Sequence, residues 1–234
     1  MKLKHILLFF ISLNCASLSL LAQENDAQAT DSISQATKYG LRVGVDLAKP
    51  LRSLFEDGYS GIEVLGDFRI TKKFYIAAEL GNEKKDREET NLNSSTSGSY
   101  IKLGADFNAN NNWFGLNNAI NLGLRYGFST FKQELVSYDI YATNQTFPPT
   151  TVNASQEFSG LTAHWAELIV GVKTEVLTNL YLSINLQLKR KLAETKPENF
   201  NNLYIPGFNR TYDFSEFGAG FGYTVSYLIP IFKK

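Results

Sequence analysis

Cysteine is nearly absent from this 234-residue chain, which holds only Cys15. A chain with one cysteine cannot form a disulfide framework or a cysteine-ligated metal site. Neither sign of charge prevails, because lysine plus arginine and aspartate plus glutamate both number 23, and no basic patch favours nucleic acid as a partner. After residue 22, no apolar run approaches the roughly 18–20 residues of a spanning helix. A helical membrane protein is therefore excluded.

The first 22 residues have the pattern of a secretory signal. Lys2 and Lys4 precede a short apolar stretch, and a polar run begins at Gln23, directly after Ala22. This layout predicts cleavage after Ala22. Lipid attachment at Cys15 is the alternative, which the poor match before that residue and the continuing apolar run after it disfavour.

Alternation of apolar and polar side chains recurs eight times after residue 37. The clearest case places Ile120, Leu122 and Leu124 on one face and Gly123 and Arg125 on the other. Period-two alternation predicts strands with two chemically different faces. The eight segments cover residues 39–47, 62–70, 74–81, 101–107, 120–129, 166–173, 180–189 and 217–227.

The connections between these segments alternate in length. Short turns are expected at 71–73, 108–117 and 177–179, and long loops at 49–61, 82–99, 132–163 and 190–216. Eight strands with alternating turn lengths are typical of outer-membrane barrels, in which the short turns and both termini are periplasmic. The pattern predicts an all-β, eight-stranded antiparallel up-and-down transmembrane β-barrel with long extracellular loops. Its domains are a signal peptide (1–22), a disordered periplasmic lead-in (23–37) and the barrel (38–234).

Alternation alone leaves open a soluble, lipocalin-like barrel with its apolar face inside. An apolar face free of charge on all eight strands, and glycines on the polar face, favour the membrane sense. Charged side chains then fill the lumen, where they persist only when paired. We expect a structural charge network, with a narrow gated pore as the alternative. Its members are Arg42, Asp46, Glu63, Asp67, Arg69, Glu79, Lys102, Asp106, Arg125, Glu167, Lys173, Glu175 and Lys189.

Aromatic residues near the segment ends predict two interfacial rings. Those expected at the short-turn end are Tyr39, Phe68, Phe74, Trp113, Phe114, Tyr181, Tyr227 and Phe232, and those expected at the long-loop end are Tyr126, Phe128, Phe131, Trp165 and Phe217.

Candidate chemistry is sparse. His164 is the only histidine after the signal, and a lipid-modifying outer-membrane enzyme could combine it with Ser159 and Glu167, although their spacing makes no recognisable triad. The charged run 83–89 could hold a divalent cation, but its interleaved lysines and arginine predict a solvated loop. We therefore predict no catalytic, cofactor-binding or metal-binding residue.

The long loops are the best candidates for contact with an extracellular ligand. Exposed aromatics beside prolines form rigid contact surfaces, or they pack on one another above the barrel. The aromatic candidates are Tyr138, Tyr141, Phe147, Phe200, Tyr204, Phe208 and Tyr212.

The signal, the eight segments and the closing strand at 220–227 resemble small outer-membrane barrels of the OmpA/OmpX type. More closely, the chain resembles uncharacterised outer-membrane barrel families that end in Ile-Pro-aromatic-Lys-Lys, here at 229–234. The resemblance implies insertion by the barrel assembly machinery and contact with outer-membrane lipids and lipopolysaccharide. It carries over no catalytic residue, so a structural or surface-interaction role is expected.

Overall fold

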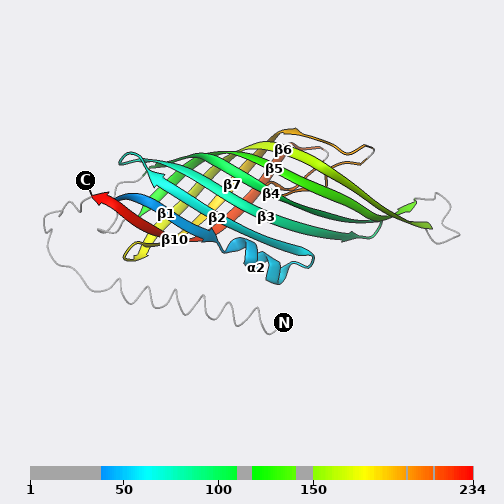
Figure 1. The fold of residues 1–234 in the computed structure, drawn as a ribbon, viewed down its shortest axis with the longest axis horizontal. Helices are drawn as coiled ribbons and strands as arrows, with labels where there is room; N and C mark the ends of the chain where they lie inside the picture. Colours follow the sequence, from blue (N-terminus) through cyan, green and yellow to red (C-terminus); the bar gives the residue numbers. More distant parts are fainter. Residues whose placement is uncertain (1–37, 110–117, 141–149, 199, 213, 234) are drawn as a thin grey trace. The chain divides into compact units, whose positions relative to one another are not determined.

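Eight long antiparallel strands hydrogen-bond in a closed ring (Figure 1). The structure is a computed structural model that describes residues 38–109, 118–140, 150–198, 200–212 and 214–233, so the predicted signal peptide and lead-in lie outside it. The ring order is β1-β10-β7-β6-β5-β4-β3-β2. The predicted eight-stranded up-and-down barrel is confirmed. The strands are β1 (Lys38–Asp46), β2 (Tyr59–Arg69), β3 (Phe74–Glu89), β4 (Leu92–Asn108), β5 (Ala119–Ile140), β6 (Thr150–Leu177), β7 (Leu180–Glu194) and β10 (Phe217–Lys233).

The two faces of the ring differ in polarity. Apolar side chains point outward, and Leu124, Leu186 and Phe221 are 65%, 68% and 64% exposed. Lys102 and Glu167 point inward and are 1% exposed. This polarity is the reverse of a lipocalin-like barrel, which keeps its apolar face inside.

The outward apolar residues form a band that we call the apolar belt. On β5 it extends from Ile120 to Phe128, and on β3 from Phe74 to Leu80. Its edge toward the long-loop end is sharp across four neighbouring strands. Leu80, Ile101, Phe128 and His164 pair in one row, and the next outward-facing row consists of Asn82, Ser99, Thr130 and Thr162.

Two segments predicted as long loops are strands instead. Most of 82–99 belongs to β3 and β4, which are joined by a turn at residues 90–91, and much of 132–163 belongs to β5 and β6. The run 83–89 is likewise a strand, not a solvated loop. Strand pairing uses backbone hydrogen bonds. Where both faces carry many polar side chains, no apolar alternation marks the strand.

Most of a short helix, α2 (Ala48–Phe55), lies in the predicted loop at 49–61. β1 ends at Asp46, which pairs with Thr224, while β10 continues outward beyond that pair. α2 contacts both β2 and β10, and so occupies the place in the wall that β1 vacates (Figure 1). Among the described residues, no helix is long and apolar enough to cross a bilayer.

The connection between β7 and β10 folds into the outer mouth of the barrel. It contains the hairpin of β8 (Tyr204–Ile205) and β9 (Asn209–Arg210). Residues 202–208, which we call the plug, are almost entirely buried. Ile205 and Phe208 form an apolar cluster with residues of the barrel wall, namely Tyr100, Phe131, Leu161, Ala163 and Trp165.

Of the aromatics expected at the interfaces, Phe74, Tyr126, Phe217 and Tyr227 are each more than 50% exposed on the outer face, whereas four others are buried, and the interfacial positions expected for those four are wrong. Phe131 and Trp165 face inward, because the plug supplies an apolar surface for them to cover. Tyr181 also faces inward, with its ring 4.7 Å from the guanidinium carbon of Arg42. Tyr39 is also buried, beside a register shift between β1 and β10, with its ring centre 5.5 Å from the guanidinium carbon of Arg69.

Candidate functional site

Ion pairs occupy the lumen at the level of the apolar belt. Lys102 Nζ lies 3.1 Å from Glu63, 2.5 Å from Glu79 and 3.8 Å from Glu167. Lys189 Nζ lies 3.9 Å from Glu167 and donates a 2.7 Å hydrogen bond to the plug carbonyl of Gly207. This first cluster therefore links strands β2, β3, β4, β6 and β7 to the plug.

Two further groups of charges lie nearer the short-turn end. Arg125 bridges Glu79 at 3.0 Å and Asp106 at 2.7 Å. Asp67 accepts hydrogen bonds from Arg42 at 2.7 Å and from Lys173 at 2.8 Å. Every charge in these groups contacts at least one of opposite sign, as buried charges require.

Three other expected members of the network have different contacts. Arg69 is partly exposed and donates to the backbone carbonyls of Thr71 and Lys72 in the β2–β3 turn. Glu175 is also partly exposed and accepts a hydrogen bond from the backbone of Asn179. Asp46 is buried, but it accepts backbone N–H bonds at the junction of β1 and α2.

Little space remains between these side chains. A cavity of about 50 Å³ lies within the lumen, lined in part by Asp67, Asn121, Lys173 and Asn185. At about 15 Å³ for each probe-sized water, it has room for about three water molecules. The filled lumen is the structural counterpart of an eight-stranded barrel, whose interior is just wide enough for its side chains.

Glu83 anchors the plug from β3. Its buried carboxylate pairs with Lys49 and accepts hydrogen bonds from Tyr204 Oη at 2.6 Å and from the backbone N–H of Gly207 at 3.0 Å. Burial alone raises the pKa of this carboxyl, but Lys49 and the two hydrogen bonds outweigh burial and lower the pKa to about 2. Glu83 falls within the segment 82–99, which the sequence predicted to be a loop. Its position four residues after Glu79, on the same face of a strand, is the signal that identifies it.

Gln133 of β5 is a second anchor that the sequence did not single out. Its side-chain oxygen accepts a hydrogen bond from the backbone of Leu203 at 2.9 Å, and its amide donates to the carbonyl of Asn201 at 3.0 Å. The plug is therefore held by two strands, β3 and β5, which flank β4 in the ring.

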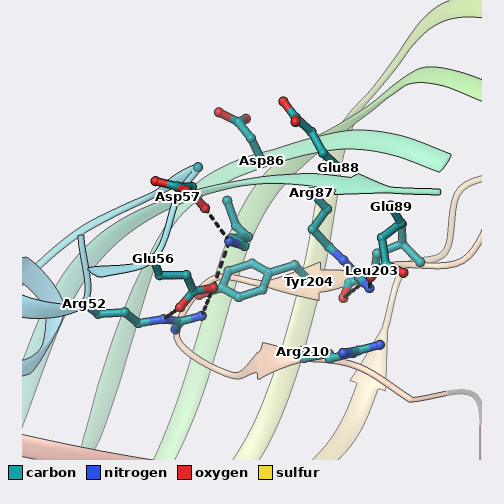
Figure 2. Close-up of a pocket in the computed structure, with 12 residues that line it drawn as sticks. Arg52, Glu56, Asp57, Asp86, Arg87, Glu88, Glu89, Leu203, Tyr204 and Arg210 are labelled. Carbon is teal, nitrogen blue, oxygen red and sulfur yellow. Dashed lines mark hydrogen bonds and ion pairs between the residues drawn. The ribbon is translucent and has the colours of Figure 1, made fainter. Parts of the chain in front are cut away.

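A charged cleft of about 480 Å³ lies beside the plug at the outer mouth (Figure 2). Nine of its twelve lining residues are charged, and they come from α2, the following turn, β3 and β9. The charged residues are Arg52, Glu56, Asp57, Lys85, Asp86, Arg87, Glu88, Glu89 and Arg210.

Glu56 is the centre of the cleft's pairing. It accepts a hydrogen bond from Arg52 at 3.1 Å and pairs with Lys85 at 2.8 Å. The hydrogen bond from Arg52 lowers the pKa of Glu56 to about 2, with Lys85 contributing in the same direction. Arg87 pairs with Glu89 and donates a 3.4 Å hydrogen bond to the carbonyl of Leu203. The cleft walls are thus preformed by ion pairs.

The loop contact candidates have three different positions. Tyr204 and Phe208 are buried in the plug, and Phe200 packs 5.9 Å from Phe158. Tyr138 and Tyr212 are 37% and 42% exposed. Tyr141 and Phe147 lie outside the described residues.

His164 lies at the outer edge of the apolar belt. Its Nδ1 is 2.8 Å from Tyr126 Oη, and its ring centre is 4.9 Å from that of Phe128. Glu167 is three residues further along β6 and therefore faces the lumen, because successive side chains of a strand point to opposite faces. The structure does not bring these two side chains together.

The fold and the polarity of its two faces define a small eight-stranded barrel with a filled lumen and a plugged mouth. The chain belongs to a family described as a domain of unknown function, DUF6048, whose model matches residues 5–234. A search among curated proteins found no match.

Two solved structures have similar folds. One is Ail, the attachment invasion locus protein of Yersinia pestis, at 9% identity and a TM-score of 0.39, with 83% of this chain and 99% of that chain covered. The other is a major outer membrane protein from Thermus thermophilus, at 13% identity and a TM-score of 0.38, with 82% and 98% covered.

Proposed function

We propose that this protein is a non-conducting outer-membrane barrel that interacts with an extracellular ligand through the charged cleft at its mouth. The observation that carries the proposal is the double closure of the interior. Ion pairs fill the lumen around Lys102, and the plug held by Glu83 closes the mouth above them.

The apolar belt supports the membrane location. Burying a leucine or phenylalanine side chain is worth about 1.5–3 kcal/mol relative to leaving it in water. A barrel in water would leave tens of such side chains exposed around its circumference, whereas lipid chains cover them. The nine residues from Ile120 to Phe128 match the roughly 9–11 residues with which a tilted strand crosses the hydrocarbon core.

The orientation follows from the connections. Short turns at 70–73 and 178–179 lie at the end where β1 and β10 have their termini, and such turns are periplasmic in outer-membrane barrels. The plug and the charged cleft then face outward. Contact with lipopolysaccharide and insertion by the barrel assembly machinery belong to the same proposal.

The cleft favours a polar ligand that carries charge. It offers four cationic and five anionic side chains, so a ligand with charges of both signs, such as a peptide, can exchange the internal ion pairs for contacts of its own. Arg210 is exposed at its edge, beside the ring of Tyr212. The proposal includes no catalytic step.

Conductance across a planar bilayer tests the closed interior. We expect no current steps from the full chain, nor from a variant in which residues 200–212 are replaced by a short Gly-Ser linker, because ion pairs still fill the lumen. A porin serves as the positive control. Current steps in the linker variant alone would support the gated-pore alternative and overturn the proposal.

Binding to a peptide array tests the cleft. The full chain in lipid nanodiscs is expected to bind peptides of mixed charge, and the double variant Arg87→Gln with Arg210→Gln to lose that binding. Lys132→Gln is the matched control, since Lys132 is an exposed cation on β5 that pairs with Glu157 and does not line the cleft. Equal binding by all three proteins would contradict the assignment of the cleft.

A further inference from the structure

The wall of the barrel changes composition where α2 replaces β1. Outward of Thr224, β10 has no strand partner on its β1 side, because β1 ends at Asp46. The backbone N–H of Leu47 donates a 2.7 Å hydrogen bond to the carbonyl of Tyr223 at this junction. Beyond that point, α2 lies beside β10.

An apolar groove of about 360 Å³ lies between α2 and β10. Ala48, Leu51 and Phe55 of the helix line one side, and Phe221 and Tyr223 of the strand line the other. Phe221 and Tyr223 belong to the apolar belt, so the groove is continuous with the surface that faces lipid in the proposed function. Leu51 and Phe55 are 45% and 66% exposed, which leaves this side of the helix uncovered by the chain itself.

Two charged residues of α2 and the turn that follows it, Arg52 and Glu56, also line the groove. Arg52 and Glu56 line both this groove and the charged cleft, so the two spaces share a wall. The Arg52 guanidinium lies 3.9 Å from the centre of the Tyr59 ring and donates to Asn209 of β9 at 3.2 Å. The groove is therefore lined both by apolar residues of the belt and by an arginine of α2.

We propose that this groove is a binding site for one membrane lipid, with an acyl chain between Leu51, Phe55 and Phe221 and a phosphate headgroup at Arg52. The inference rests on the proposed membrane location. An acyl chain is the apolar partner that the belt surface meets there, and its burial against the helix is favourable by the hydrophobic effect. Arginine binds phosphate through paired N–H donors. In Arg52 these donors, Nε and Nη2, are held by Glu56, so a phosphate takes the place of Glu56 at Arg52 while Glu56 keeps its ion pair with Lys85.

Native mass spectrometry of the full chain tests the site. The protein is released from mixed micelles that contain phosphatidylglycerol and phosphatidylcholine in equal amounts, and retained lipids are counted. We expect the natural chain to retain one phosphatidylglycerol. The double variant Leu51→Ser with Phe55→Ser should retain it about tenfold more weakly, since two apolar contacts are lost.

Two further variants separate the parts of the site. Leu122→Ser with Leu124→Ser removes two exposed apolar residues from the belt on β5, away from α2, and should retain lipid like the natural chain. Arg52→Gln should still retain a lipid but lose the preference for phosphatidylglycerol over phosphatidylcholine. Equal retention by the groove variant and the β5 variant, retention of detergent only, or a second protein copy in place of the lipid would overturn the inference. So would equal retention of both lipids by the natural chain.

Insertion into lipid vesicles distinguishes this inference from the proposed function. If the natural chain inserts and is shielded from protease, but retains no lipid, the groove assignment fails and the membrane location stands. If it does not insert, the proposed function fails as well.

Discussion

The middle of the barrel and its outer mouth have opposite polarity. At the level of the apolar belt, Leu124 points outward and Lys102 lies inside among carboxylates. At the mouth, Phe208 and Phe131 pack inside, while the outward row consists of polar residues such as Ser99 and Thr130. One continuous set of strands therefore carries an inverted core in one region and an ordinary apolar core in the next.

This inversion follows from what surrounds each region. With the belt in hydrocarbon, as proposed, apolar side chains are stable outside, and the narrow lumen must be filled by groups that satisfy one another. Above the belt the strands meet water, so the hydrophobic effect drives apolar groups inward. The eight strands do not supply enough of them, and the connection between β7 and β10 contributes Ile205 and Phe208.

Removing the central cation of the lumen should have the largest effect. Lys102→Met leaves Glu63, Glu79 and Glu167 buried near one another without their shared partner. We expect a loss of about 4 kcal/mol in the free energy of unfolding, measured by urea titration in lipid vesicles. The control is Lys84→Met, at an exposed residue of β3. Equal losses for the two variants would refute a structural role for the lumen charges.

Truncation in the apolar core of the mouth should have the next largest effect. Phe208→Ala removes a ring that is 2% exposed and lies 6.1 Å from Trp165. We expect a loss of about 3 kcal/mol, seen in urea unfolding followed by the fluorescence of Trp165 in a Trp113→Phe background. Phe214→Ala is the matched control, because Phe214 lies in the same connection and is 88% exposed. An equally large loss in the free energy of unfolding for Phe214→Ala would contradict the expectation that the buried Phe208 ring stabilises the mouth and the exposed Phe214 ring does not.

Acid should loosen the mouth through Glu83. Its pKa is about 2 in the folded protein against an ordinary 4.5, so its stabilising effect is complete above about pH 4.5 and is lost as the pH falls toward 2. We expect about 2–3 kcal/mol over this range, measured as increased protease cleavage within 195–216. The protease should cleave the Glu83→Gln variant readily at neutral pH, and its cleavage should increase less as the pH falls. An unchanged acid dependence in that variant would assign the effect to another carboxyl.

Arginine placed on the outward face should distinguish the two regions on one strand. Leu124→Arg lies within the belt, and we expect it to destabilise the barrel in vesicles by about 2 kcal/mol. Val136→Arg, on the part of β5 beyond the polar row, should change stability by less than about 0.5 kcal/mol. Equal effects would place both positions in the same surroundings and would remove the basis for the membrane location.

Strands were predicted correctly from the sequence where the alternation of apolar and polar side chains was strong. Ile120 to Phe128 and the other apolar segments were placed on strands, and the outward and inward sets were separated correctly for most of them. The prediction was wrong where alternation faded: the outer halves of β5 and β6 were taken as loop, and α2 was missed. The helix α2 has only eight residues and contains Pro50 near its start. Its helical periodicity is therefore too short to be told from a loop in the sequence.

The position of the plug could not be predicted from the sequence either. Its aromatic residues were identified, but a loop with aromatic residues has the same sequence pattern whether it is exposed or folded into the mouth. Glu83 and Gln133 decide between these outcomes, and they lie 121 and 70 residues away in the chain from their partners Tyr204 and Leu203. Contacts across such separations leave no local pattern.

By itself, the sequence determined that the chain forms eight two-faced strands and which face carries charge, because side-chain period along a strand is a local property. Only the tertiary structure decided how the charges pair, how far the strands continue past the belt, and what closes the mouth. Those outcomes depend on which distant side chains meet when the ring closes, and ring closure is a property of all eight strands together.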